Sequence, residues 1–250
     1  MSAFADFSTE VRRRLDDLDL EVRAGGLDKA VDLIVSSLQR GGVVQAFGTG
    51  HSQAFAMEIA GRAGGLIPTH AIVLRDVVLR GSRDISMLQG AALERDESVA
   101  DELYGLYSFE PADVFVIASN SGVNGSIVGF ALRAKANGHP VIAVTSLAHT
   151  NAVAPKHSSG KRLSEIADVV IDNRAPFGDT TIDLGDGLSA GAVSSITAAY
   201  IAQLLTLGTA RRLRDAGEVP PLYLSANIPG GDTHNDALKA RYGERIAGHA

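Results

Sequence analysis

The sequence predicts a doubly wound α/β fold built on a five-stranded parallel sheet, with helices added at both ends of the chain. Five short apolar runs are the expected strands, at residues 43–47, 71–74, 114–118, 141–145 and 168–171. Several of these runs lack alternating polar residues, which is typical of parallel strands covered by helices on both faces. Two of them pass directly into a glycine- or serine-rich loop and then a helical pattern, the first half of a βαβ unit.

The chain begins with two helical patterns, which predict an N-terminal helical hairpin over residues 1–40. Apolar residues recur at helical spacing between 11 and 22, and again between 27 and 38. Ser8 or Thr9 is the expected N-cap of the first helix, and glycine pairs at 25–26 and 41–42 end the two segments.

Further helices are expected between and after the strands. One follows the first loop as far as Gly61, and others are predicted at 93–107, 124–136, 189–214 and 232–246. The helix at 189–214 is rich in small residues and leucine, which indicates a buried position, and the prolines at 220–221 separate it from the last helix. We therefore expect one main domain at residues 41–215 and a C-terminal extension at 216–250.

Composition excludes several classes of protein. With no cysteine among 250 residues, the chain has no disulfide, thiolate zinc site, iron–sulfur cluster or cysteine nucleophile. The net charge of −6 argues against general nucleic-acid binding, which needs a basic surface. The first segment is charged throughout, and no apolar run approaches the roughly 18–20 residues of a membrane span. A cytoplasmic protein without membrane contact is expected.

Two loops at strand ends carry the residues best suited to binding an anion. The first, Gly48–Ser52, lacks the third glycine of a dinucleotide fingerprint and the lysine of a Walker A loop. The second, at 119–124, reads SNSGVN. Either loop alone fits a plain strand–helix turn with a capping residue, but both should lie at the sheet edge where ligands bind. We predict one phosphate-sized site containing Gly50, Ser52, Ser119, Asn120, Ser121 and Asn124, with Ser146 and Asp179 after later strands.

These loops resemble the sugar-phosphate loops of the SIS (sugar isomerase) domain, in which strands end in Gly-x-Gly-x-Ser and Ser-x-Ser-Gly. The resemblance covers residues 40–215 and implies a flavodoxin-like doubly wound sheet. Longer motifs resemble a bacterial family of single-SIS-domain proteins, among them FGTGHS, EIAGRAGG, VTSLAHT, KHSSGKRLSEIADVVIDN and SANIPGGD. More distantly, the chain is similar to N-acetylmuramic acid 6-phosphate etherase and phosphoheptose isomerase. Because SIS domains act on or sense phosphosugars, the resemblance implies a phosphorylated sugar as ligand and indicates a reaction only weakly.

Three glutamates are candidates for the base that removes a proton beside a sugar carbonyl. Glu58 lies six residues after Ser52, about 9 Å along a helix, which is roughly the reach of a sugar held by its phosphate. Glu94 and Glu97 are one turn apart on the expected helix and share a face. Their segment is similar to an acidic stretch of the etherase, in which Glu97 is the closer match, whereas the other etherase glutamate falls on Arg62. For all three glutamates, a solvated helix face is the alternative interpretation.

Histidines are candidates for proton transfer near neutral pH. His51 lies in the first loop, and His157 lies in a basic, hydroxyl-rich loop, so both are counted as candidate catalytic residues. His149 follows a strand end. Phosphoheptose isomerases of this fold can bind zinc through histidine and glutamate, but the spacing of His51 and Glu58 is poor for zinc. We therefore expect no metal and no cofactor.

The leading hypothesis is a lyase that eliminates water from an amino-sugar 6-phosphate, such as N-acetylglucosamine 6-phosphate, after abstraction of the C2 proton. An aldose–ketose phosphosugar isomerase and a non-catalytic phosphosugar sensor are the alternatives. Family resemblance implies a homodimer or homotetramer. The motifs at 225–227 and 230–232 are candidates for completing the pocket of a neighbouring subunit.

Overall fold

A five-stranded parallel sheet forms the centre of the molecule, and its strand order is β2-β1-β3-β4-β5. The computed structural model describes residues 2–246. The strands are β1 (Val44–Gly48), β2 (Thr69–Ile72), β3 (Val114–Ala118), β4 (Val141–Thr145) and β5 (Val169–Asp172). Every residue of β1, β3 and β4 is buried, which explains why these runs show no polar alternation. The predicted fold class is confirmed.

The direction of winding changes between β1 and β3. From β1 the chain crosses to β2 on one side, whereas β3, β4 and β5 follow one another on the other side. The chain therefore leaves β1 and β3 toward helices on opposite faces of the sheet, and the gap between the two loops is a topological switch point, the place where open α/β sheets bind ligands.

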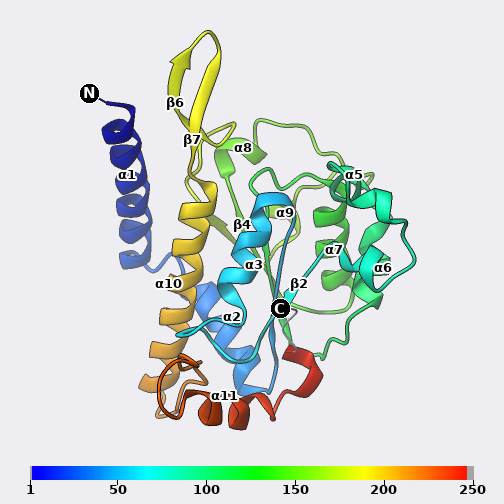
Figure 1. Ribbon diagram of the computed structural model, residues 1–250, viewed down its shortest axis with the longest axis vertical. Helices are drawn as coiled ribbons and strands as arrows, with labels where there is room; N and C mark the ends of the chain where they lie inside the picture. The colour runs from blue at the N-terminus through cyan, green and yellow to red at the C-terminus, as the bar shows by residue number, and fades with distance from the viewer. Residues whose placement is uncertain (1, 247–250) are drawn as a thin grey trace.

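Helices cover both faces of the sheet (Figure 1). One face packs against α2 (Asp28–Gln39), α3 (Gln53–Ile59) and α10 (Ser194–Asp215). The other face packs mainly against α6 (Val99–Gly105) and α7 (Gly125–Ala136), with the short helices α4 (Asp76–Leu79), α5 (Ala92–Arg95) and α9 (Leu163–Ile166). Helix α8 (Leu147–Thr150) directly follows β4.

The first helix, α1 (Ala3–Arg23), lies alongside α10, away from the sheet (Figure 1). Its N-cap is Ser2, whose hydroxyl accepts a hydrogen bond from the Ala5 N–H, so the helix begins before the expected Ser8 or Thr9. A turn leads from α1 to α2, and α2 also packs against α10.

The prediction of a single helix at 93–107 is wrong, because the helical conformation stops at Asp96 and resumes at Val99, which gives two helices, α5 and α6. The Asp96 carboxylate accepts hydrogen bonds from the Ser98 N–H at 2.8 Å and from its hydroxyl at 2.7 Å. This local pairing competes with the hydrogen bonds that would continue a helix. Glu94 and Glu97 therefore do not share the face of one helix.

A β-hairpin replaces the start of the long helix expected at 189–214. Strands β6 (Thr180–Gly185) and β7 (Leu188–Ala192) pair antiparallel and project from the domain (Figure 1). The turn places Asp186 and Gly187 at φ values of 53° and 75°, which suits the Asp-Gly pair of a hairpin turn. Helix α10 then begins at Ser194.

The C-terminal extension covers the amino-terminal edge of the sheet. Tyr223 and Ile246 pack against Val43 and Ile67, which precede β1 and β2. The helix expected at 232–246 is shorter, because α11 (Gly231–Lys239) ends before a separate turn of 3-10 helix at Gly243–Ile246. Over residues 2–246, no helix combines the length and apolarity needed to cross a membrane.

Candidate functional site

The loop after β1 turns tightly because it contains glycine at two positions. A Cβ at Gly48 would lie 2.3 Å from the backbone oxygen of Ser52, closer than any side chain permits. Gly50 has a φ of +55°, and a Cβ there would lie 3.2 Å from the Glu94 Oε2 atom. The first loop therefore folds back on itself and lies directly beside the Glu94 carboxylate.

The loop after β3 is held by its own hydrogen bonds. The Ser119 hydroxyl accepts a hydrogen bond from the Gly122 N–H at 3.1 Å, and the Asn120 carbonyl accepts one from the Ser146 N–H at 3.1 Å. The Asn120 side-chain oxygen accepts a further bond from the Asn173 amide, also at 3.1 Å. These bonds fix the loop and leave Ser121 at its tip.

One cavity of about 440 Å³ joins the two loops. Eight predicted site residues line it: Gly50, His51, Ser52, Glu94, Ser119, Asn120, Ser121 and Asp179. Within residues 2–246, the hydroxyls of Ser52 and Ser121 have no hydrogen-bond partner. The structure thus brings together most of the predicted anion site and one of the three candidate carboxylates.

Glu94 is held in place by the start of α7. The Asn124 side-chain amide donates a hydrogen bond to Glu94 Oε1 at 2.5 Å, and the Ser126 hydroxyl donates one to the Glu94 carbonyl at 2.8 Å. Between them, Gly125 permits close approach, since a Cβ there would lie 2.4 Å from the Arg95 carbonyl oxygen. Asn124 occupies the N-cap position of α7 but its side chain does not cap the helix. It positions Glu94, whose Oε2 is left facing the glycine loop.

The wall formed by residues 177–195 lies next to the β6–β7 hairpin, and Asp179 alone among its lining residues was a predicted site residue. Asp179 has a φ of 70°, and its carboxylate accepts hydrogen bonds from the Val193 N–H, the Ser194 N–H and the Ser194 hydroxyl. Asp179 therefore lines the cavity, but its oxygens are occupied in capping α10. Additional lining residues on this side are Gly178, Thr180, Ala192, Ser194 and Ser195.

His149 also lines the cavity and was not among the predicted site residues. Its Nδ1 accepts a hydrogen bond from the Gly178 N–H at 3.2 Å, and the Phe177 ring packs against it with ring centroids 5.1 Å apart. Because Nδ1 is an acceptor, the proton of the neutral ring is on Nε2. The signal in the sequence was only its position just after a strand end.

Comparison with known proteins shows the family to which the chain belongs. A model of the SIS domain matches residues 6–146. The UPF0309 protein lmo0025 of Listeria monocytogenes is 35% identical over 242 residues, which cover 96% of this chain and 97% of that protein. The UPF0309 protein BH3325 of Halalkalibacterium halodurans is also 35% identical, covering 96% and 98%.

The chain belongs to the SIS-domain family.

Two solved structures share the fold of this SIS protein. A phosphoheptose isomerase from Francisella tularensis has a TM-score of 0.55 at 16% identity, covering 84% of this chain and all of that one. The E. coli CFT073 protein c3406 in complex with A5P has a TM-score of 0.53 at 16% identity, covering 84% and 89%. At this level of identity the likeness extends to the fold alone.

Glu58 lies outside the cavity of the SIS protein. Its carboxylate pairs with Arg62 one turn along the chain and accepts a hydrogen bond from the Gln203 amide at 2.7 Å. The side chain therefore faces α10 instead of the two loops. Its distance along the helix predicted that Glu58 would reach a bound sugar. The side chain instead points toward Gln203 of α10, away from the cavity.

Glu97 and His157 form a separate pair beyond α5. Glu97 Oε2 accepts the Ser158 N–H at 2.8 Å and lies 3.7 Å from His157 Nε2. The hydrogen bonds from Ser158 and the nearby His157 hold the pKa of Glu97 below its usual value. Neither residue lines the cavity. Glu97 matches the etherase more closely in sequence register, but Glu94 is the glutamate that lies in the site.

Ser146 has a structural role. It is fully buried, its hydroxyl donates a hydrogen bond to the Ala175 carbonyl at 2.6 Å, and it accepts one from the His149 N–H at 3.0 Å. It therefore caps α8, the helix that carries His149. Among residues 2–246, no group of three or more histidine, aspartate or glutamate side chains is arranged to hold a metal ion.

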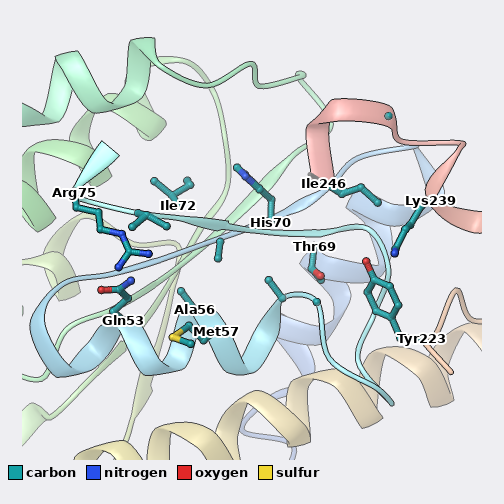
Figure 2. Close-up of a pocket in the computed structure, with 15 residues that line it drawn as sticks. Gln53, Ala56, Met57, Thr69, His70, Ile72, Arg75, Tyr223, Lys239 and Ile246 are labelled. Carbon is teal, nitrogen blue, oxygen red and sulfur yellow. The ribbon is translucent and has the colours of Figure 1, made fainter. Parts of the chain in front are cut away.

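A larger cavity, of about 570 Å³, is lined by Gln53, Ala56 and Met57 of α3 (Figure 2). It extends along the outer edge of β2 between α3 and the C-terminal extension, and we call it the β2-edge cavity. None of the predicted site residues lines it, and it shares no lining residue with the 440 Å³ cavity. Size alone would favour this cavity as the active site, but the smaller one contains the carboxylate, the imidazole and both hydroxyl-bearing loops.

Proposed function

We propose that this SIS protein binds a phosphorylated sugar in the 440 Å³ cavity and isomerises it between aldose and ketose by moving a proton at C2. The observation that carries the proposal is the position of Glu94 beside the glycine loop. The Asn124 side-chain amide holds it there by a hydrogen bond of 2.5 Å to Glu94 Oε1. A phosphosugar ligand is also supported by the family and by the phosphoheptose isomerase that shares the fold.

The phosphate is proposed to bind between the two loops. Ser52 and Ser121 offer hydroxyl donors, and the sheet edge at a switch point is a common position for phosphate groups. Ser195, at the start of α10, contributes a third hydroxyl to the same cavity. A phosphate in this position leaves the sugar carbons free to extend toward Glu94.

Glu94 is proposed as the base. One of its oxygens accepts the Asn124 hydrogen bond, and the other is free to accept the C2 proton. The electron pair of the broken C–H bond then forms the C1–C2 double bond, and the carbonyl oxygen gains negative charge. Return of the proton to C1, together with transfer of the hydroxyl proton from O2 to O1, gives the ketose with its carbonyl at C2, and no atom is gained or lost.

His149 is proposed to stabilise the oxygen that becomes negatively charged. With Nδ1 occupied by the Gly178 N–H, the neutral ring offers its Nε2–H as a hydrogen-bond donor to the cavity. A neutral imidazole suits this task, because its N–H polarises a carbonyl oxygen by donating a hydrogen bond to it. A positioned donor of this kind typically contributes about 10²–10³ in rate.

Elimination of water is the second candidate, favoured by the similarity of the Leu93-Glu94-Arg95 segment to the etherase. It shares the first proton abstraction but needs a second acid to protonate the departing hydroxyl. The other carboxylates are poorly placed for this, since Asp179 caps α10 and Glu58 and Glu97 lie outside the cavity. Isomerisation therefore fits the available groups better.

The test is incubation of the purified protein with glucose 6-phosphate, arabinose 5-phosphate and N-acetylglucosamine 6-phosphate in deuterated water. Exchange of the C2 hydrogen, followed by NMR, is expected for a substrate of either reaction. In ordinary water, an unchanged product mass supports isomerisation, whereas loss of one water supports elimination. Binding without C2 exchange for any of these sugars would contradict the enzyme and favour a sensor. Sedimentation velocity checks the expected homodimer or homotetramer.

A further inference from the structure

The β2-edge cavity has the size and shape of a second ligand site. Its volume of about 570 Å³ falls within the roughly 300–1,000 Å³ typical of small-molecule pockets. Strand β2 is the edge strand of the sheet, so its outer side forms one wall. Helix α3 forms a second wall, and Tyr223, Lys239 and Ile246 of the C-terminal extension form the third (Figure 2).

The charge of this cavity is of one sign. The described residues that line it include the cations Arg75 and Lys239 and no aspartate or glutamate, although the Lys239 ammonium also lies 3.8 Å from the carboxylate of Asp236, outside the lining. No carboxylate within residues 2–246 pairs with Arg75, and Figure 2 places its guanidinium group next to the Gln53 amide. Together these groups provide donors for a carboxylate, phosphate or sulfonate.

The space between the two cations is lined largely by apolar side chains. Figure 2 shows Arg75 and Lys239 at opposite ends, with Ala56 and Met57 of α3 on one side and Thr69, His70 and Ile72 of β2 on the other. At the far end, the Lys239 ammonium lies 5.6 Å from the centre of the Tyr223 ring. A ligand that fits has an acidic group at the Arg75 end and an apolar body that extends toward Tyr223.

We propose that the β2-edge cavity binds a small organic anion with an apolar or aromatic body, and that Arg75 and Gln53 hold its acidic group. This site is separate from the phosphosugar site, because the two cavities share no lining residue. They are nevertheless adjacent along the chain, since Ser52 lines one and Gln53 lines the other.

The test uses 1-anilinonaphthalene-8-sulfonate, a fluorescent probe with a sulfonate group and an aromatic body. We expect saturable binding of one probe per chain to the full-length protein. Arg75→Ala should weaken the affinity about three- to tenfold, and the double variant with Lys239→Ala should weaken it further. Ala60→Phe, which places a ring in the cavity, should abolish the binding. Arg133→Ala is the matched control, because it removes an exposed arginine that pairs with Asp101 on α6, and should leave the affinity unchanged.

Two further measurements distinguish this site from the phosphosugar site and from an interface between subunits. Glucose 6-phosphate should not displace the probe, and Ser121→Ala should not change its affinity, so the result is independent of the proposed enzyme activity. Equal affinity in the wild type, Arg75→Ala and the folded Ala60→Phe variant would overturn the proposal. So would dissociation of an oligomer by Arg75→Glu in sedimentation velocity, because it would show that a second copy of the chain covers this cavity.

Discussion

Replacement of Asn124 by alanine tests how the base is positioned without touching the base itself. The substitution removes the hydrogen bond between the Asn124 amide and Glu94 Oε1, which is 2.5 Å long. A hydrogen bond to a charged group contributes about 1.5–3 kcal/mol, which corresponds to roughly 10- to 150-fold in rate if all of it is lost from the transition state. Water can enter the vacated space and replace part of the bond, so we expect a loss near the lower end of this range.

The assay is the steady-state rate of phosphosugar turnover, with kcat and KM determined separately. In Asn124→Ala, kcat should fall about tenfold or more, whereas KM should change little because the phosphate-binding loops are intact. Asn137→Ala is the matched control, since Asn137 lies at the opposite end of α7 and its side-chain amide donates a hydrogen bond to the Arg133 carbonyl at 2.8 Å. An unchanged kcat in Asn124→Ala, or an equal fall in both variants, would refute the role of Asn124.

Three other predictions follow from the structure. Ser121→Ala should weaken binding of glucose 6-phosphate in calorimetry by about 1–3 kcal/mol if its hydroxyl contacts the phosphate, and an unaltered affinity would remove it from the site. Glu58→Gln should leave kcat within about twofold, because its part-exposed pair with Arg62 lies outside the cavity; a large loss would restore Glu58 as the base. Burial raises the pKa of Asp168, but hydrogen bonds from Lys135 and the Val141 N–H outweigh this and lower it overall. Asp168 thus stabilises the fold above its unfolded-state pKa of about 4 and loses this effect as the pH falls through its lower folded-state value. Asp168→Asn should therefore lower Tm at pH 7 and make little difference near pH 2, and an equal change at both values would contradict the assignment.

The fold could be predicted from the sequence because the patterns that identify its strands and helices lie within short stretches of the chain. Buried parallel strands appear as uninterrupted apolar runs, and four of the five strands lie within one residue of both predicted ends, at 44–48, 114–118, 141–145 and 169–172. The hairpin at 180–192 was hidden because its residues are small and mostly exposed, so they show neither a strand nor a helix pattern clearly. The Asp-Gly pair at its turn was the available signal.

The site could be predicted only in part, because the ends of strands can be located in a sequence but the directions of side chains cannot. The two loops converge as predicted, since the carboxyl ends of neighbouring parallel strands share one edge. The choice among three glutamates depended on contacts between residues distant in sequence. The Gln203 amide binds the Glu58 carboxylate beside α10, and the Ser158 N–H binds the Glu97 carboxylate outside the cavity. His149 could be recognised only when Gly178, 29 residues later, was placed against it.

The central claim is that a single cavity holds the phosphate between Ser52 and Ser121 and presents C2 of the sugar to Glu94. A crystal structure of the Glu94→Gln variant with glucose 6-phosphate tests it most directly. We expect the phosphate between the two loops, C2 about 3–3.5 Å from the side-chain oxygen or nitrogen of residue 94, and the carbonyl oxygen near His149 Nε2. A phosphate bound elsewhere, or C2 closer to Glu58 or Glu97, would contradict it.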